Sequence, residues 1–137
     1  MDTNFKIEFL DHVAIRVKDI KVSVEWYERV LGLKKYQLPA WGEVPIFMMS
    51  HKTGVALFPA QLQDEPLNSL SKNVKIDHFA FQVTSKNFEK AKRKFEALDI
   101  AFELQDHHYF DSLYIKDPDG HTVELTTLKV SENEFYL

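Results

Sequence analysis

Two histidines, His12 and His78, stand in matching short sequences, and the chemistry open to such side chains is metal binding or proton transfer. Leu10-Asp-His12 recurs as Ile76-Asp-His78, an offset of 66 residues from position 12 to position 78, and alanine and valine follow at the same spacing in both copies. The chain contains no cysteine, which excludes disulfides, thiolate metal sites and cysteine nucleophiles. Any metal ion bound here must therefore be held by His, Asp or Glu.

A third side chain with this chemistry, Glu124, lies on a predicted β-hairpin near the C-terminus. The predicted turn is Asp117-Pro-Asp-Gly120, in which proline fixes φ and glycine can take a positive φ. Both flanks alternate between polar and apolar residues, which is typical of strands with one buried face. Glu124 falls on the polar face of the second strand, and Tyr114 falls on the polar face of the first.

The segments that must position these side chains form two similar halves. Residues 9–17 and 75–83 alternate as strands, and each is followed by apolar residues at helical spacing, with Asp19 and Ser85 as predicted N-caps. Three short strands then follow in each half: residues 33–38, 45–50 and 54–58, and residues 100–104 with the two hairpin strands. Each half therefore reads β-α-β-β-β.

A second match between the halves supports an internal duplication. Val55-Ala-Leu57 corresponds to Val123-Glu-Leu125, an offset of 68 residues from position 56 to position 124. Two offsets this close, on strands of matching type, indicate a repeat. Ala56 is then the counterpart of Glu124.

The length of 137 residues favours one domain with its own core. Within the single domain 1–137 we expect four segments: module one at about residues 8–60, a linker at about 61–74, module two at about 75–128, and a short tail at 129–137. No apolar run approaches the ~20 residues needed to cross a bilayer, and the N-terminus lacks the apolar segment of a signal peptide. The net charge of −4, without a long basic cluster, argues against a nucleic-acid partner. We expect a cytoplasmic protein with no membrane partner.

These residues resemble the vicinal oxygen chelate superfamily, which includes glyoxalase I, extradiol dioxygenases, fosfomycin-resistance proteins and bleomycin-binding proteins. The resemblance covers residues 8–128 and rests on these motifs: His12-x-x-x-Arg16-Val17, Trp26-Tyr27…Val30-Leu31-Gly32, Asp77-His78, and Asp117-Pro-Asp-Gly120…Glu124-Leu125. It implies an α+β fold of two tandem βαβββ modules, whose curled mixed sheets form half-barrels around a metal-binding cleft. It also implies that His12, His78 and Glu124 bind one divalent metal ion, which could be Fe, Mn, Ni, Co or Zn.

Other polar residues are predicted to serve the substrate. Tyr114 is a candidate catalytic hydrogen-bond donor, with a simple wall aromatic as the alternative. Arg16 and Gln82 are candidate substrate-binding residues: Arg16 would bind an anionic group unless it pairs with a neighbouring acid, and Gln82 could be a wall residue. His107 or His108 is near enough in sequence to act as an acid or base, although both are more often exposed loop residues.

Differences between this sequence and the individual families argue against some of their activities. Glyoxalase I has a glutamate at the position of Ala56, so we predict that this chain lacks glyoxalase I activity. Fosfomycin-resistance proteins match the His, His, Glu set and the Asp111-Ser-x-Tyr114 run, but they carry threonine at the position of Ala14 and a potassium loop in place of residues 107–110. Bleomycin-binding relatives usually lack the metal ligands.

The expected function is that of a metal-dependent enzyme whose small-molecule substrate chelates a divalent metal through adjacent oxygens. Extradiol-type ring cleavage and glyoxalase-like lyase chemistry are the favoured reactions. The alternatives are an antibiotic resistance or binding protein of the fosfomycin- or bleomycin-resistance type, and a metal-free member that only binds a ligand. A homodimer is expected.

Overall fold

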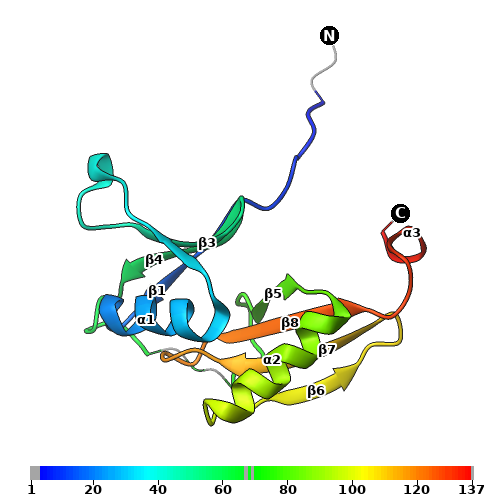
Figure 1. Cartoon of the computed structure of the whole chain (residues 1–137). Coiled ribbons are helices and arrows are strands. Elements are labelled where there is room, and N and C mark those ends of the chain that lie inside the picture. Colours follow the sequence, from blue (N-terminus) through cyan, green and yellow to red (C-terminus); the bar gives the residue numbers. More distant parts are fainter. Residues whose placement is uncertain (1–3, 67, 69, 137) are drawn as a thin grey trace. The chain divides into compact units, whose positions relative to one another are not determined.

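A four-stranded mixed sheet with one helix beside it is built twice along the chain (Figure 1). The structure is a computed structural model that describes residues 4–66, 68 and 70–136. The chain divides into two compact units between Gln61 and Leu62, and each unit contains one βαβββ module. The predicted α+β class and the two modules are confirmed, whereas the curl of the sheets and the metal-binding cleft stay predictions.

Module one has its first strand at one edge of the sheet. Its sheet order is β1-β4-β3-β2, with β1 parallel to β4 and the other pairs antiparallel. The elements are β1 (His12–Val17), α1 (Ile20–Leu31), β2 (Lys34–Tyr36), the 3₁₀ turn η1 (Pro39–Trp41), β3 (Ile46–Ser50) and β4 (Thr53–Pro59). The first strand therefore lies directly beside the last.

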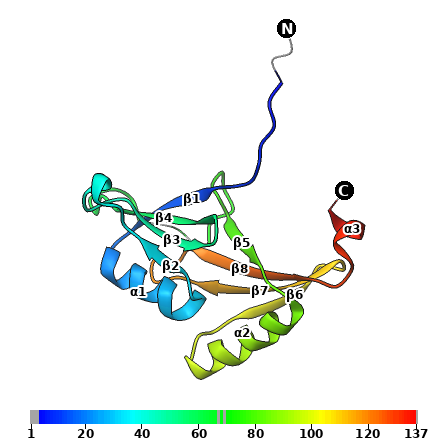
Figure 2. The same cartoon turned by 45° about the horizontal axis from the view of Figure 1, so that its top comes forward.

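Module two repeats this topology. Its sheet order is β5-β8-β7-β6, again with a parallel pair formed by the first and last strands. The elements are β5 (His78–Gln82), α2 (Ser85–Ala97), β6 (Glu103–Asp106), β7 (Phe110–Lys116) and β8 (Thr122–Leu128). Figure 2 shows α2 lying along this sheet. Between the modules, the described residues of segment 61–74 form no helix or strand.

Side-chain caps fix where the two long helices begin. Asp19 Oδ1 accepts a hydrogen bond from the Val22 backbone N (3.2 Å), as predicted, and Gly32 ends α1 with φ of 67°. The second cap is Thr84, whose Oγ1 accepts from the Asn87 N (3.2 Å), so the prediction of Ser85 was wrong by one residue. Thr84 has the extended backbone of a cap, and Ser85 is already helical.

Each sheet buries one face, and its helix supplies the covering side chains. Alternate residues of the strands form the two cores with the buried residues of α1 and α2: Ile15, Val17, Ile46, Met48, Val55, Leu57, Tyr27 and Val30 in module one, and Leu113, Ile115, Val123, Leu125, Phe88 and Phe95 in module two. The predicted site residues occupy the intervening positions. They therefore lie on the faces turned away from the helices.

The C-terminal tail packs within its own unit. Residues after β8 form the short helix α3 (Glu132–Phe135), which the sequence did not predict. The Phe135 ring lies 5.4 Å from the ring of Phe110 and 6.1 Å from that of Tyr109, measured between centroids. Among the described residues, no helix combines the length and the apolar character needed to cross a membrane.

The β7–β8 turn depends on one buried carboxylate. Asp117 is only 5% exposed, and its Oδ1 accepts hydrogen bonds from the backbone N of Asp119 (2.9 Å) and of His121 (2.8 Å). The Asp117 N donates in turn to the His121 carbonyl (2.9 Å). This closed arrangement sets the register of the two strands that carry Tyr114 and Glu124.

We expect Asp117→Ala to lower the free energy of unfolding by about 1–3 kcal/mol, because it leaves buried backbone donors without an acceptor. Denaturant unfolding followed by circular dichroism measures the change. Asp117→Asn is the matched control, since its amide oxygen can still accept, and its loss should be clearly smaller. Equal losses in the two variants would show that the acceptor oxygen is not what stabilises the turn.

Candidate functional site

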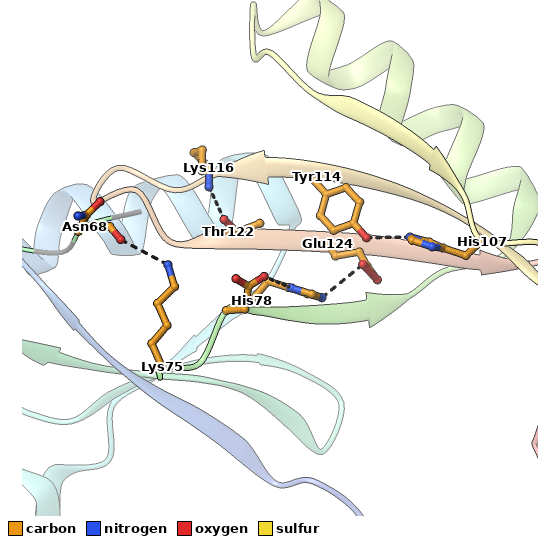
Figure 3. Close-up of polar contacts among 9 residues, drawn as sticks. Asn68, Lys75, His78, His107, Tyr114, Lys116, Thr122 and Glu124 are labelled. Carbon is orange, nitrogen blue, oxygen red and sulfur yellow. Dashed lines mark hydrogen bonds and ion pairs between the residues drawn. The ribbon is translucent and has the colours of Figure 1, made fainter. Parts of the chain in front are cut away.

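Strand register brings three of the predicted side chains onto one face of module two. Glu124 of β8 lies opposite Tyr114 of β7 and opposite Ala80 of β5. His78 is two residues before Ala80 and therefore shares its face. Figure 3 shows His78, Tyr114 and Glu124 together on this face, with His107 beside Tyr114.

Two of the predicted metal ligands, His78 and Glu124, lie close together within module two. His78 Nε2 lies 3.5 Å from Glu124 Oε1, and Glu124 is only 6% exposed. The other ring nitrogen, Nδ1, donates to Asp77 Oδ2 (2.8 Å), and this hydrogen bond lowers the pKa of the Asp77 carboxyl. The hydrogen bond to Asp77 fixes the ring orientation and leaves Nε2 directed at Glu124.

Module one contains the same Asp-His pair. His12 Nδ1 donates to Asp11 Oδ2 at 2.8 Å, the same distance as in module two. The sequence repeat contained both aspartates, but their role in orienting the imidazoles was not predicted. The centroid of the His12 ring lies 4.9 Å from that of the Phe47 ring. The Phe47 centroid lies 5.0 Å from that of the Trp41 ring. These aromatic neighbours were also not predicted.

The His78–Glu124 pair has the spacing of two ligands of one metal ion. Donor atoms about 2.0–2.2 Å from a metal, at tetrahedral or octahedral angles, are roughly 2.8–3.6 Å apart. Within each unit taken by itself, the described residues include no group of three or more His, Asp or Glu side chains that could hold a metal ion. Module two thus contributes two of the three predicted ligands, and the third, His12, belongs to module one.

Tyr114 is hydrogen-bonded to His107, one of the two neighbouring histidines between which the sequence could not decide. Its hydroxyl lies 2.9 Å from His107 Nε2, and its ring lies 5.7 Å from that of His78. Burial raises the pKa of Tyr114 to about 12, and its hydrogen bond with Glu124 adds to this effect. Tyr114 therefore keeps its proton at neutral pH. His108 is exposed with φ of 68°, so His107 is the histidine that contacts the site.

Arg16 and Gln82 occupy equivalent positions near the ends of their strands. Arg16 Nη1 donates to the Pro59 carbonyl (3.1 Å), and its guanidinium carbon lies 5.2 Å from the centroid of the Phe58 ring. Gln82 is exposed, pairs with Thr126, and shares the face of His78. Their roles in substrate binding stay predictions.

The register confirms that Ala56 is the counterpart of Glu124. Ala56 lies opposite Ala14 and Phe47, as Glu124 lies opposite Ala80 and Tyr114. Ala56 is fully buried, at 0% exposure. Module one therefore presents no carboxylate at this position.

Comparison with known proteins agrees with this fold. Residues 9–125 match the family model described as the Glyoxalase/Bleomycin resistance protein/Dioxygenase superfamily. The glutathione transferase FosA of Serratia marcescens is 26% identical over 125 residues, covering 87% of this chain and 80% of the relative. The metallothiol transferase FosB of Lysinibacillus sphaericus is 27% identical over 127 residues, covering 88% and 83%.

A solved structure has the same fold. The crystal structure of a glyoxalase/dioxygenase from Nostoc punctiforme superposes with a TM-score of 0.74 at 21% identity, covering 94% of this chain and 100% of that one. The family match extends from before β1 into β8 and so includes both modules. The chain belongs to the glyoxalase/bleomycin resistance protein/dioxygenase superfamily.

Proposed function

We propose that this chain is a metal-dependent enzyme acting on a small molecule that chelates a divalent metal ion through two adjacent oxygens. One observation carries the proposal: His78 Nε2 and Glu124 Oε1 face each other at 3.5 Å. Because Nδ1 donates to Asp77, Nε2 of the neutral imidazole carries a lone pair. Two electron-rich atoms facing each other at this distance would suit a shared cation.

The proposed third ligand is His12, which belongs to the other module. Its Nδ1 also donates to the preceding aspartate, so its Nε2 carries the lone pair as well. Two imidazoles and one carboxylate suit Fe, Mn, Ni, Co or Zn. When bound, such an ion supplies Lewis-acid chemistry and leaves coordination positions for the substrate oxygens.

Tyr114 is the proposed catalytic hydrogen-bond donor. It lies opposite Glu124, and its pKa of about 12 keeps the phenol protonated, so it can donate to a substrate oxygen on which negative charge develops. His107 is the proposed positioning residue, because its contact with the Tyr114 hydroxyl restricts where that group lies. Arg16 and Gln82 are proposed to contact the substrate from the first strand of each module.

A second candidate function is thiol transfer to fosfomycin. The names of two relatives, a glutathione transferase and a metallothiol transferase, support it. The Asp111-Ser-x-Tyr114 run shared with fosfomycin-resistance proteins supports it as well. Turnover of fosfomycin with glutathione or another low-molecular-weight thiol would choose this reaction, and its absence in metal-loaded protein would remove it.

Loss of either proposed ligand of module two should abolish tight metal binding. We expect His78→Ala and Glu124→Gln to weaken the affinity for Zn²⁺, Ni²⁺ or Mn²⁺. The loss should exceed the about 10–100-fold expected of Asp77→Ala, which removes only the acceptor that orients the His78 ring. Isothermal titration calorimetry on chelator-treated protein measures the affinities. His12→Ala should resemble His78→Ala.

The matched control for these variants is His108→Asn. It removes an exposed histidine at a positive φ that asparagine tolerates, and the metal affinity should not change. Thermal melts confirm that each variant is folded. The metal site is refuted if the parent binds none of the three ions, or if the ligand variants bind as tightly as the control.

Ala56 predicts a negative result with the glyoxalase I substrate. We expect no turnover of the methylglyoxal–glutathione hemithioacetal above background, because alanine can neither bind a cation nor move a proton. The assay follows formation of the thioester by absorbance, on protein whose content of Zn²⁺, Ni²⁺ or Mn²⁺ has been measured. Robust turnover with any of these ions would show that the carboxylate is dispensable.

Tyr114→Phe should lower kcat by about 10²–10³ without loss of metal, on whichever substrate turnover assays identify, since one donor to developing charge contributes about 2.7–4 kcal/mol. His107→Phe should lower kcat less, and His108→Asn should not change it. Steady-state kinetics and metal content are measured together. If Tyr114→Phe loses its metal or melts far below the parent, the tyrosine has a structural role instead.

A further inference from the structure

His107 reaches Tyr114 from the short loop of residues 107–109 that joins β6 to β7 (Figure 3). The His107 N donates to the Phe110 carbonyl (2.9 Å), and the Tyr109 N donates to the His107 carbonyl (2.8 Å). Both bonds join backbone atoms, so they close the turn without fixing where the His107 ring points. The contact of its Nε2 with the Tyr114 hydroxyl (2.9 Å) therefore depends on how the loop is held against the rest of the module.

The first residue after β8, Lys129, contacts both flanks of this loop and its middle. Its Nζ lies 3.0 Å from Asp106 Oδ1 at the end of β6 and 3.7 Å from Asp111 Oδ1 near the start of β7. Asp106 and Asp111 are paired residues of the β6–β7 ladder. The Lys129 N donates to the Tyr109 carbonyl (2.8 Å). Lys129 therefore ties the loop to the end of β8, the strand that carries Glu124.

The Asp106 carboxylate connects Lys129 to the loop backbone. The same Oδ1 that contacts Lys129 accepts a hydrogen bond from the His108 N (2.8 Å). Hydrogen bonding to Lys129 lowers the pKa of Asp106, and the Asp106 carboxylate raises the pKa of Lys129, so both groups are charged at neutral pH. The ammonium group, the carboxylate and the backbone next to His107 thus form one continuous path.

Solvent exposure decides what the Lys129–Asp106 ion pair can contribute. The side chains of Lys129 and Asp106 are 38% and 64% exposed. Ion pairs open to solvent contribute little to the free energy of folding. Module two is stabilised instead by its buried core, which includes Phe95, Leu113 and Val123. Loss of the Lys129 charge should therefore change where the loop lies while the module stays folded.

We propose that Lys129 is a positioning residue that, through Asp106 and Asp111, holds His107 against the Tyr114 hydroxyl. This inference rests on the proposed function, in which Tyr114 donates to the substrate. A phenol has one proton to donate, and His107 Nε2 at 2.9 Å restricts the rotation of that O–H. A loop that carried His107 away would leave the hydroxyl free to rotate. Lys129 thereby acts on Tyr114 through His107.

Nuclear magnetic resonance of the full-length chain tests this position without a substrate. His107→Gln identifies the His107 ring signals among those of the six histidines, and we expect nuclear Overhauser effects between this ring and Tyr114. Lys129→Met and Asp106→Ala remove the ion pair from opposite ends. Each should weaken these effects and speed hydrogen exchange of the His107 and Tyr109 amides at least about tenfold. Lys129→Arg should keep the parent signals, because it keeps the charge.

The matched control is Lys92→Met. Lys92 Nζ lies 3.0 Å from Glu89 Oε1, the same distance as in the Lys129–Asp106 pair, but this ion pair joins two residues of α2. The control should leave the ring signals and the amide exchange of the loop unchanged. Thermal melts of every variant report whether it is folded.

A double-mutant cycle tests the route through His107, on the substrate that turnover assays identify. Lys129→Met should lower kcat by about three- to thirtyfold, the coupling expected within one network, while KM and metal content stay the same. In protein that already carries His107→Phe, Lys129→Met should lower kcat no further, because the group that it positions is gone. An equal further loss would show that Lys129 acts by another route, and the inference would be wrong.

Three results separate the possible failures. Unchanged ring and amide signals in both Lys129→Met and Asp106→Ala overturn the inference and leave the metal site intact. Melting temperatures far below the parent in both variants show that the ion pair stabilises the whole module, which also overturns it. Changed signals, together with an unchanged kcat in Tyr114→Phe, support the positioning of His107 and refute the proposed role of Tyr114.

Discussion

Parallel pairing of the first and last strands in each module is the constraint on which the candidate site depends. In module two it places β5 directly beside β8, so that His78 and Glu124, 46 residues apart in sequence, reach the same face. The helix that connects β5 to the following strands covers the other face and builds the core there. The candidate site and the hydrophobic core therefore lie on opposite faces of the same sheet. Side chains of the site can change without repacking the core.

The two modules differ in the side chains that this face carries. Both keep the Asp-His pair with the same 2.8 Å hydrogen bond, so each retains an imidazole with Nε2 available. Beside that pair, module two carries Glu124 and Tyr114 where module one carries Ala56 and Phe47. Only module two therefore has a carboxylate and a phenol at these positions.

Much of this arrangement could be predicted from local sequence, because alternation and turn chemistry act over a few residues. The Asp117 turn, the β-α-β-β-β order and the shared face of Tyr114 and Glu124 all follow from such patterns. Thr84 and Ser85 are both good capping residues, so sequence alone could not choose between them. The His107–Tyr114 contact and the row of His12, Phe47 and Trp41 depend on side chains from different strands and loops, which no local pattern specifies.

The packing of the C-terminal helix has a practical consequence for handling the protein. The Lys129 N donates to the Tyr109 carbonyl (2.8 Å), the His107 N donates to the Phe110 carbonyl (2.9 Å), and Phe135 rests against Phe110. Lys129 and α3 are thus joined to the loop that carries His107. We therefore expect a tag or label fused after α3 to disturb this loop. Labels therefore belong at the N-terminal end, where Phe5 extends into solvent.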